Sequence, residues 1–430
     1  MAQRLNAADT DFKKSFDAFV MKDRDGGEDV SAIVREVVAN VRANGLNAVK
    51  TYTERFDRFN LTDKNMRVTA DEIENADKKC DMADLDALDF AAARIHSYHQ
   101  KQIPADERYT DDEGVTLGWR WTSVDAAGLY APGGRAAYPS SVLMNAIPAK
   151  VAGVSRLTMV TPAPDGEINP LVLAAAKRAG IDEIYRIGGA QAIAALAYGA
   201  GPIAPVDVIV GPGNAYVAEA KRQVFGVVGI DSVAGPSEIL VVADAKNDPH
   251  WIAADLLSQA EHDPSSQSIL ITDDKDFANK VAVSVGEQLK EHTRREIAET
   301  AWNNNSAIIV VASLEDAPAL VNAIAPEHLE LAVDEPEELL VNIRHAGAIF
   351  MGRFAPEAIG DYVAGPDHVL PTARAARYAS GLSVLDFMKR TSIIGCDETA
   401  LKKIGPQAAR LADAEGLPSH AKSVRVRIRD

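Results

Sequence analysis

The stretch most informative about the fold reads Gly235-Pro236-Ser237-Glu238, then Ile239-Leu240-Val241-Val242-Ala243, and later Gln259-Ala260-Glu261-His262. The apolar, β-branched run at 239–243 is typical of a buried strand. A turn at Asn247-Asp248-Pro249 follows, and a helical pattern occupies about 250–261. Gln259 and His262 are three residues apart and share one helix face, and a histidine can bind a metal. This strand–loop–helix unit predicts one wall of an active site.

Similar short apolar runs recur through residues 114–380, most of them separated by a segment of helix length. Parallel βαβ units require this alternation. The runs lie at 156–160, 183–187, 206–210, 239–243, 268–272, 307–311 and 347–351. Residues 157–170 and 239–249 show a weak similarity in their order of strand, turn and helix. Two related α/β halves would explain it, and so would the order of elements common to all βαβ units. The pattern predicts an α/β fold preceded by a helical region at about 11–103.

Composition narrows the class of protein. With 47% hydrophobic and 25% charged residues, the chain resembles ordinary soluble globular proteins. A net charge of −17 argues against nucleic acid or an anionic membrane as partner, because both require a basic surface. Cys80 and Cys396 are the only cysteines, which excludes a disulfide framework and a cysteine zinc motif. The N-terminus lacks the apolar core of a signal peptide, and we expect a cytoplasmic protein.

Three glycine-rich turns suggest a ligand crevice. They are Tyr130-Ala131-Pro132-Gly133-Gly134, Gly188-Gly189-Ala190-Gln191 and Gly211-Pro212-Gly213-Asn214-Ala215-Tyr216. The third turn approaches a dinucleotide fingerprint, with Asp231 twenty residues beyond Gly211, but Tyr216 occupies the place of the last glycine. A tight strand-to-helix turn is the alternative explanation. Because ligands bind outside the carboxyl ends of parallel strands, the three turns together predict a crevice without identifying its ligand.

Histidines and acidic residues in polar or glycine-rich contexts are candidate site residues. The histidines are His262, His328, His368 and His420, and the acids are Glu327, Asp361 and Glu415. Taken singly, each has an ordinary structural explanation, since a histidine in a loop is most often a surface residue. The residue types alone therefore leave a metal site and a set of surface positions as open alternatives.

The blocks together resemble the histidinol dehydrogenase family almost from end to end. They are 130–141, 188–191, 210–214, 234–238, 259–262, 327–329, 360–362, 368–372, 415–416 and His420. The resemblance implies oxidation of L-histidinol to L-histidine through histidinaldehyde with two NAD, the last two steps of histidine biosynthesis. It further implies a homodimer with one zinc ion per subunit and two incomplete Rossmann-like halves.

The resemblance also assigns roles to residues. Glu327 would be the base that activates water for attack on the aldehyde, and His328 would accept a proton in both oxidations. Zinc would be held by Gln259, His262, Asp361 and by His420 of the neighbouring subunit. NAD would be bound by Tyr130, Gln191 and Asn214. Substrate contacts would come from Ser237, Gln259, His262, His328, Asp361, His368, Glu415 and His420, with Glu415 also reaching across from the neighbouring subunit.

The resemblance sets the expected division of the chain. We expect an N-terminal helical arm at 1–25 and a first α/β globule, on the metal and catalytic side, from 26–110 plus 236–380. A second globule on the NAD side would comprise 111–235, and 381–430 would form a dimerisation extension. The alternating segment 423–428 predicts a strand-like tail.

One residue departs from the family pattern, and two alternative functions remain open. Asp367 stands where the family more often has Asn, which affects the electrostatics of its loop. A paralogue that oxidises another small alcohol, such as a sulfonated diol, is the alternative enzyme, and a binding protein without catalysis is the alternative class. Glu415 and His368 favour an imidazole substrate, because an anionic one would be met by Arg or Lys. Glu327 and His328 argue against loss of catalysis.

Overall fold

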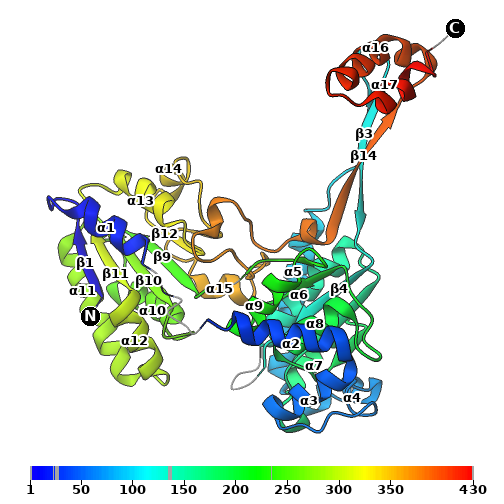
Figure 1. Cartoon of the computed structure of the whole chain (residues 1–430). Helices are drawn as coiled ribbons and strands as arrows, with labels where there is room; N and C mark the ends of the chain where they lie inside the picture. Colours follow the sequence, from blue (N-terminus) through cyan, green and yellow to red (C-terminus); the bar gives the residue numbers. More distant parts are fainter. Residues whose placement is uncertain (1, 23, 25–28, 134–137, 234, 429–430) are drawn as a thin grey trace.

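The computed structural model of the protein describes residues 2–22, 24, 29–133, 138–233 and 235–428. Residues 134–137 of the first glycine-rich block and Ala234 of the 234–238 block lie outside the described residues. Two parallel sheets, each covered by helices on both faces, form two globules, and a C-terminal extension projects from one of them (Figure 1). The predicted α/β class with two such halves is confirmed.

Within the described residues, the first globule is built on a six-stranded sheet in which all pairings are parallel. Its strands, in spatial order, are β1 (Gln3–Asn6), β11 (Ala307–Val310), β10 (Gln267–Thr272), β9 (Glu238–Ala243), β12 (His328–Ala332) and β13 (Ala348–Met351). One face is covered by α10 (Pro249–Ala260), α11 (Lys275–Glu291) and α12 (Arg295–Asn305). The other face carries α1 (Phe12–Val20), α13 (Ala317–Ile324) and α14 (Pro336–Leu340). The quoted run at 239–243 is therefore a fully buried inner strand, as predicted.

The second globule contains a five-stranded parallel sheet. Its order is β6 (Glu183–Tyr185), β5 (Arg156–Val160), β4 (Ala126–Tyr130), β7 (Val208–Val210) and β8 (Gly229–Ile230). One face packs on α5 (Met82–Gln100), α6 (Pro139–Ala152) and α7 (Pro170–Arg178). The opposite face packs on α2 (Ser31–Asn44), α3 (Leu46–Asp57), α8 (Gly189–Tyr198) and α9 (Ala215–Val224), while the short α4 (Ala70–Glu74) lies against α7.

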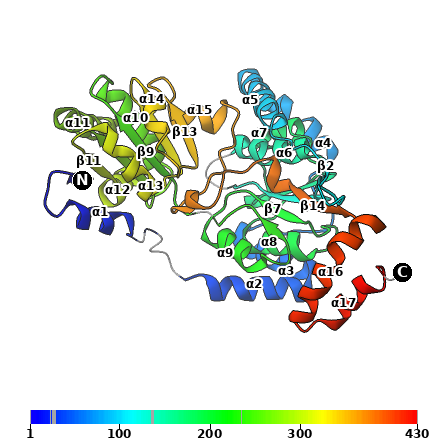
Figure 2. The same ribbon diagram turned by 90° about the horizontal axis from the view of Figure 1, so that it is seen from above.

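The assignment of residues 26–110 to the first globule is wrong. The apolar stripe of α2, with Val34, Val37 and Val41, is buried in the core of the five-stranded sheet, and α5 is buried on that sheet's other face. Figure 2 shows α2 and α3 with the second globule, whereas α1 lies with the first. An amphipathic stripe indicates that a helix has a buried face, but it does not say which of two sheets covers it. Residues 1–25 also include a strand, β1, which extends the six-stranded sheet beside β11.

The C-terminal extension stands on an antiparallel ribbon. Strand β3 (Thr116–Ser123) pairs with β2 (Glu107–Thr110) and with β14 (Met388–Gly395), and this ribbon carries α16 (Glu398–Ala414) and α17 (Pro418–Arg425) away from the globules (Figure 1). The predicted strand-like tail is wrong, because most of 423–428 continues α17 and its following turn. Pro418 starts that helix, and Val424 packs over Gly405 of α16. None of the helices in the described part of the chain could cross a membrane.

Candidate active site

The predicted catalytic residues lie at the amino-terminal edge of the six-stranded sheet. Ser237 directly precedes β9, and His328 begins the neighbouring strand β12. Helix α10 runs back from the far end of β9 towards the start of β10, so Gln259 and His262 at its C-terminal end return to this edge. A short helix, α15 (Glu357–Tyr362), brings Asp361 to within 3.7 Å of His328.

His328 is held in one orientation by the backbone. Its Nδ1 lies 2.9 Å from the carbonyl oxygen of Glu238. Since a carbonyl oxygen only accepts, Nδ1 donates, and in the neutral ring Nε2 carries the lone pair. Nε2 is buried and has no hydrogen-bond partner among the described residues, and it lies 3.7 Å from an oxygen of Asp361 and 3.8 Å from one of Glu357. In its neutral form the ring would therefore present a free proton-accepting atom to the site.

Glu327 is locked to Glu238 by a reciprocal pair of hydrogen bonds. The backbone N–H of Glu238 donates to Glu327 Oε2 at 2.9 Å, and the N–H of Glu327 donates to Glu238 Oε2 at 3.3 Å. Glu327 Oε2 also lies 3.6 Å from His328 Nδ1. Burial raises the pKa of Glu327 to about 7, although the charge of His328 and the N–H of Glu238 oppose that rise. A carboxyl group with this pKa can exchange protons near neutral pH.

The site carries an excess of buried negative charge. Burial lowers the pKa of His328, but Glu327, Asp361 and Glu357 outweigh it and raise that pKa to about 10. Burial and the neighbouring Asp361 raise the pKa of Glu357 to about 8. Burial also raises the pKa of Asp361, yet its interaction with His328 and the charges of His368 and His262 bring it below its ordinary value. Acidic groups gathered in this way suit a bound cation.

Several of these groups could hold a metal ion. Ligand atoms of His328, Glu357 and Asp361 all lie within 4.8 Å of one another. Of the predicted zinc ligands, Asp361 belongs to this group, and His262 follows the C-terminal end of α10 at the same edge of the sheet. Gln259 is buried, and its Oε1 has no hydrogen-bond partner in the described part of the chain. This set of nitrogen and oxygen donors, including an orphaned buried oxygen, fits zinc.

Glu357 was not predicted as a site residue. It lies four residues before Asp361, so the two carboxylates share one face of α15, and this spacing was the available signal. A second unpredicted contact is Ser141 of α6, whose hydroxyl lies 3.2 Å from His368 Nε2. His368 Nδ1 in turn donates to the carbonyl oxygen of Asp361 at 2.9 Å. His368 thus connects α15 with the second globule.

His420 and Glu415 are not brought to this site within one chain. Glu415 follows the last turn of α16 and His420 lies in α17, and both are exposed at the outer end of the extension (Figure 1). The remaining predicted ligands and substrate contacts come from the first globule and the 360–372 segment. A single chain therefore leaves the predicted residue set incomplete.

The predicted NAD-binding residues lie at the carboxyl edge of the five-stranded sheet. Tyr130 ends β4, Gln191 lies in the first turn of α8, and Asn214 caps the N-terminus of α9. The Tyr130 hydroxyl accepts the N–H of Gly189 at 3.1 Å, and burial raises the pKa of Tyr130 to about 12. The structure brings together the three glycine-rich turns at the edge where α/β sheets bind ligands.

Asp231 does not act as the ribose-binding acid of a dinucleotide fingerprint. It forms a buried ion pair with Lys221, and it accepts the N–H of Gly211 at 2.8 Å. Gly211 has φ of +113°, and a Cβ at this position would meet the carbonyl oxygen of Tyr130 at 2.2 Å. Gly211 is therefore required by the close approach of the Tyr130 backbone, and Asp231 stabilises the same tight turn through the Gly211 N–H and Lys221.

Asp367 is buried beside the predicted substrate contact His368. One oxygen accepts the N–H of Val369 at 2.8 Å, and the other is buried without a hydrogen-bond partner in the described residues. Burial raises the pKa of Asp367 well above its usual range, and the charges of Asp386 and Asp231 add to that effect. A protonated Asp carries one hydrogen-bond donor and one acceptor, and so does the amide of Asn. The protonated form of Asp367 therefore offers the same kinds of hydrogen-bonding groups as the Asn that the family more often has.

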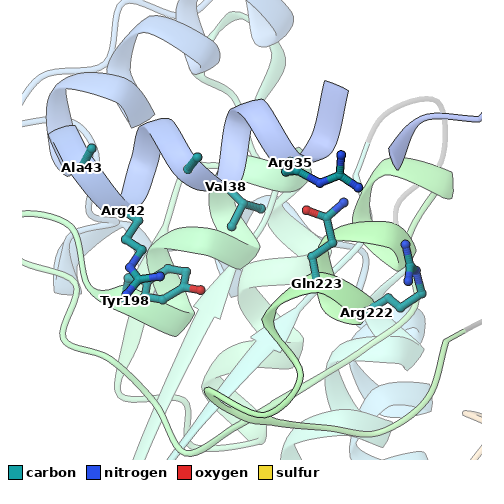
Figure 3. A pocket seen from close by; sticks show the side chains of 8 residues that line it. Arg35, Val38, Arg42, Ala43, Tyr198, Arg222 and Gln223 are labelled. Carbon is teal, nitrogen blue, oxygen red and sulfur yellow. The ribbon is translucent and has the colours of Figure 1, made fainter. Parts of the chain in front are cut away.

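A separate hollow lies on α2, α8 and α9, away from these residues (Figure 3). Arg42 stacks over Tyr198 at 5.2 Å, and Arg222 pairs with Glu219 at 2.6 Å. These two guanidinium groups already have partners, and none of the predicted site residues lines the hollow. We do not assign it to the active site.

The known proteins that this chain resembles are histidinol dehydrogenases. A family model for histidinol dehydrogenase matches residues 21–428. Histidinol dehydrogenase of Rhodospirillum rubrum is 60% identical over 100% of this chain and 99% of its own length, and that of Caulobacter vibrioides is 58% identical over 99% of each. A crystal structure of histidinol dehydrogenase from Elizabethkingia anophelis gives a TM-score of 0.94 at 37% identity, covering 99% of this chain and 98% of the other. The chain belongs to the histidinol dehydrogenase family.

Proposed function

We propose that the protein oxidises L-histidinol to L-histidine through histidinaldehyde, with two NAD as hydride acceptors. The observation that carries this proposal is the orientation of His328. Its Nδ1 is fixed on the Glu238 carbonyl, and its free Nε2 faces Asp361 with Glu327 directly beside the ring. Full-length similarity to histidinol dehydrogenases supports the same substrate.

The two oxidations use the same pair of residues in sequence. In the first, His328 Nε2 accepts the proton of the substrate hydroxyl as hydride leaves its carbon. Glu327, as a carboxylate, then takes a proton from the water that adds to the aldehyde, and His328 accepts the proton of the resulting hydrate as the second hydride leaves. NAD would accept each hydride from a position beside Tyr130, Gln191 and Asn214. The first oxidation removes one hydride and one proton, which His328 releases to solvent before the second oxidation. The second oxidation adds one water and removes one hydride and two protons, one taken by Glu327 and one by His328.

Zinc would be held by Gln259, His262 and Asp361 together with the partner's His420. When bound, it would supply orientation, by coordinating substrate nitrogens in the open part of its shell. Its positive charge would offset the carboxylates that raise the pKa of His328, so that the neutral imidazole is available near neutral pH. Ser237, His368 and the partner's Glu415 would make further contacts with the substrate.

A homodimer would complete the site. The ribbon of β3 and β14 carries α16 and α17 clear of the globules, where the two helices pack mainly against each other (Figure 1). In a two-fold dimer each extension would reach the other subunit. Cys80 and Cys396 form no disulfide, which fits the reducing cytoplasm as the compartment.

The test is NADH formation by zinc-loaded protein with L-histidinol and, in parallel, with a sulfonated diol. We expect turnover with histidinol and none with the diol. His328→Asn should abolish the turnover of histidinol and leave the zinc content unchanged. Turnover of the diol in preference to histidinol would assign a different substrate. A zinc-loaded dimer that turns over neither compound would refute the proposed oxidoreductase activity.

A further inference from the structure

Two carboxyl groups outside the predicted site are packed directly behind it. Glu330 follows His328 by two residues in β12, so both side chains are on the sheet face that α10 covers. Asp255 lies in α10, one turn before Gln259. Glu330 is buried with 3% of its surface exposed, and its carboxyl group interacts electrostatically with that of Asp255. Neither residue has a role in the mechanism above.

Glu330 also fixes the start of α15. Its Oε1 accepts the backbone N–H of Glu357 at 2.6 Å. Glu357 is the first residue of α15, and the first N–H groups of a helix have no partner within it. A second tie runs from Ser258 of α10, whose hydroxyl donates to Glu357 Oε2 at 3.2 Å. Helix α15 is thus attached to β12 and to α10 at the same point.

These ties set the relative positions of the predicted zinc ligands. Asp361 lies one turn along α15 from Glu357, and Gln259 lies one turn along α10 from Asp255. We propose that Glu330, through Asp255 and the Glu357 N–H, is a positioning residue that holds Asp361 opposite Gln259 and so determines the affinity for zinc. This inference rests on the zinc site of the proposed function.

The charges of the pair agree with this geometry. Burial raises the pKa of Glu330 well above its usual range, and it raises the pKa of Asp255 to about 6. Two adjacent carboxylates in a buried position disfavour double ionisation, and Glu330 is the partner that retains the proton. A glutamine can form both bonds, since its oxygen accepts from Glu357 N–H and its NH2 group donates to Asp255. A leucine of similar size can form neither.

The experiment measures the zinc affinity of the full-length protein by competition with a chromophoric chelator. We expect Glu330→Gln to bind zinc within about threefold of the parent, and Glu330→Leu about 10- to 100-fold more weakly, as for other residues that orient metal ligands. Glu337→Leu, an exposed position of α14, is the control for loss of a charge in the same globule. NAD affinity should be the same in all variants, because the predicted NAD residues lie on the other sheet.

The inference would be overturned if Glu330→Leu bound zinc as tightly as the parent, or if Glu330→Gln lost as much zinc affinity as Glu330→Leu. A parent protein that binds no zinc would overturn it as well. If Glu330→Leu does not fold, Asp255→Ala and Asp255→Asn replace it. Asn keeps an acceptor for Glu330 and should retain parental affinity, whereas Ala should lose at least about threefold, and equal affinities would overturn the inference. A parent that binds zinc without oxidising histidinol would refute the proposed function and leave this test intact.

Discussion

The pKa of Glu327 leads to a quantitative prediction for the second oxidation. Glu327 is proposed to act as a carboxylate that takes a proton from water, so its reaction requires the deprotonated form. Burial raises its pKa to about 7. Activity should therefore be full above this pH and should be lost as the pH falls through it.

The size of the effect follows from the titration curve. With a pKa of about 7, roughly nine tenths of Glu327 is ionised at pH 8 and roughly one tenth at pH 6, which is about a tenfold change in rate. Glu327→Gln retains the size of the side chain and removes the base. It should lower the rate of aldehyde oxidation by about 10²- to 10⁴-fold, as expected for a general base.

The assay supplies histidinaldehyde directly and follows NADH under saturating NAD and zinc from pH 5.5 to 9. The exposed Glu337→Gln is a matched control and should reproduce the parental profile. Glu327 is not the base if the parental rate does not fall between pH 8 and pH 6, or if Glu327→Gln oxidises the aldehyde at the parental rate.

Three further predictions concern the dimer, a turn and the departure at Asp367. Mixing His420→Ala with Glu327→Ala subunits should restore about a quarter of parental activity, because half of randomly formed dimers are hybrids with one intact site; inactive hybrids of proven composition would refute the shared site. Gly211→Ala should lower the free energy of unfolding in urea by more than Gly226→Ala, which has a similar positive φ but open space around its Cβ; equal losses would show that the close contact costs nothing. The pKa of Asp367 is raised on folding, so the parent loses stability as the pH rises above the ordinary value of a carboxyl group, and Asp367→Asn does not. The stability of the variant relative to the parent should therefore rise between pH 4 and pH 8 in urea unfolding, and a pH-independent difference would contradict the raised pKa of Asp367.

The parallel sheets could be predicted because their strands are buried on both faces. The run at 239–243 is continuous and apolar, the run at 156–160 is buried from Leu157 onward, and helix-length segments separate both from the next strand. The antiparallel strand β3 was not predicted, because Thr116–Ser123 is only partly buried and its sequence mixes polar and apolar residues without a continuous apolar run. Its pairing with β14, more than 260 residues away, is a long-range contact that no local pattern encodes.

The candidate site was only partly predictable for a related reason. Gln259 and His262 could be paired by their helical spacing, but Glu357 belongs to the site through the packing of α15 against β12 and α10. Asp231 had the spacing of a ribose-binding acid, whereas its actual role depends on Lys221, ten residues earlier in the preceding helix α9. Spacing along the chain identifies residues that share a face, and tertiary packing decides which of those faces meet.

In the proposed function, one site carries out both oxidations. It is tested most directly by counting the NADH formed when a limiting amount of L-histidinol is consumed by the zinc-loaded protein with excess NAD. We expect about two NADH for each histidinol, with histidine as the product, since a four-electron oxidation requires two hydride transfers. A yield of one NADH, with histidinaldehyde accumulating in solution, would contradict it.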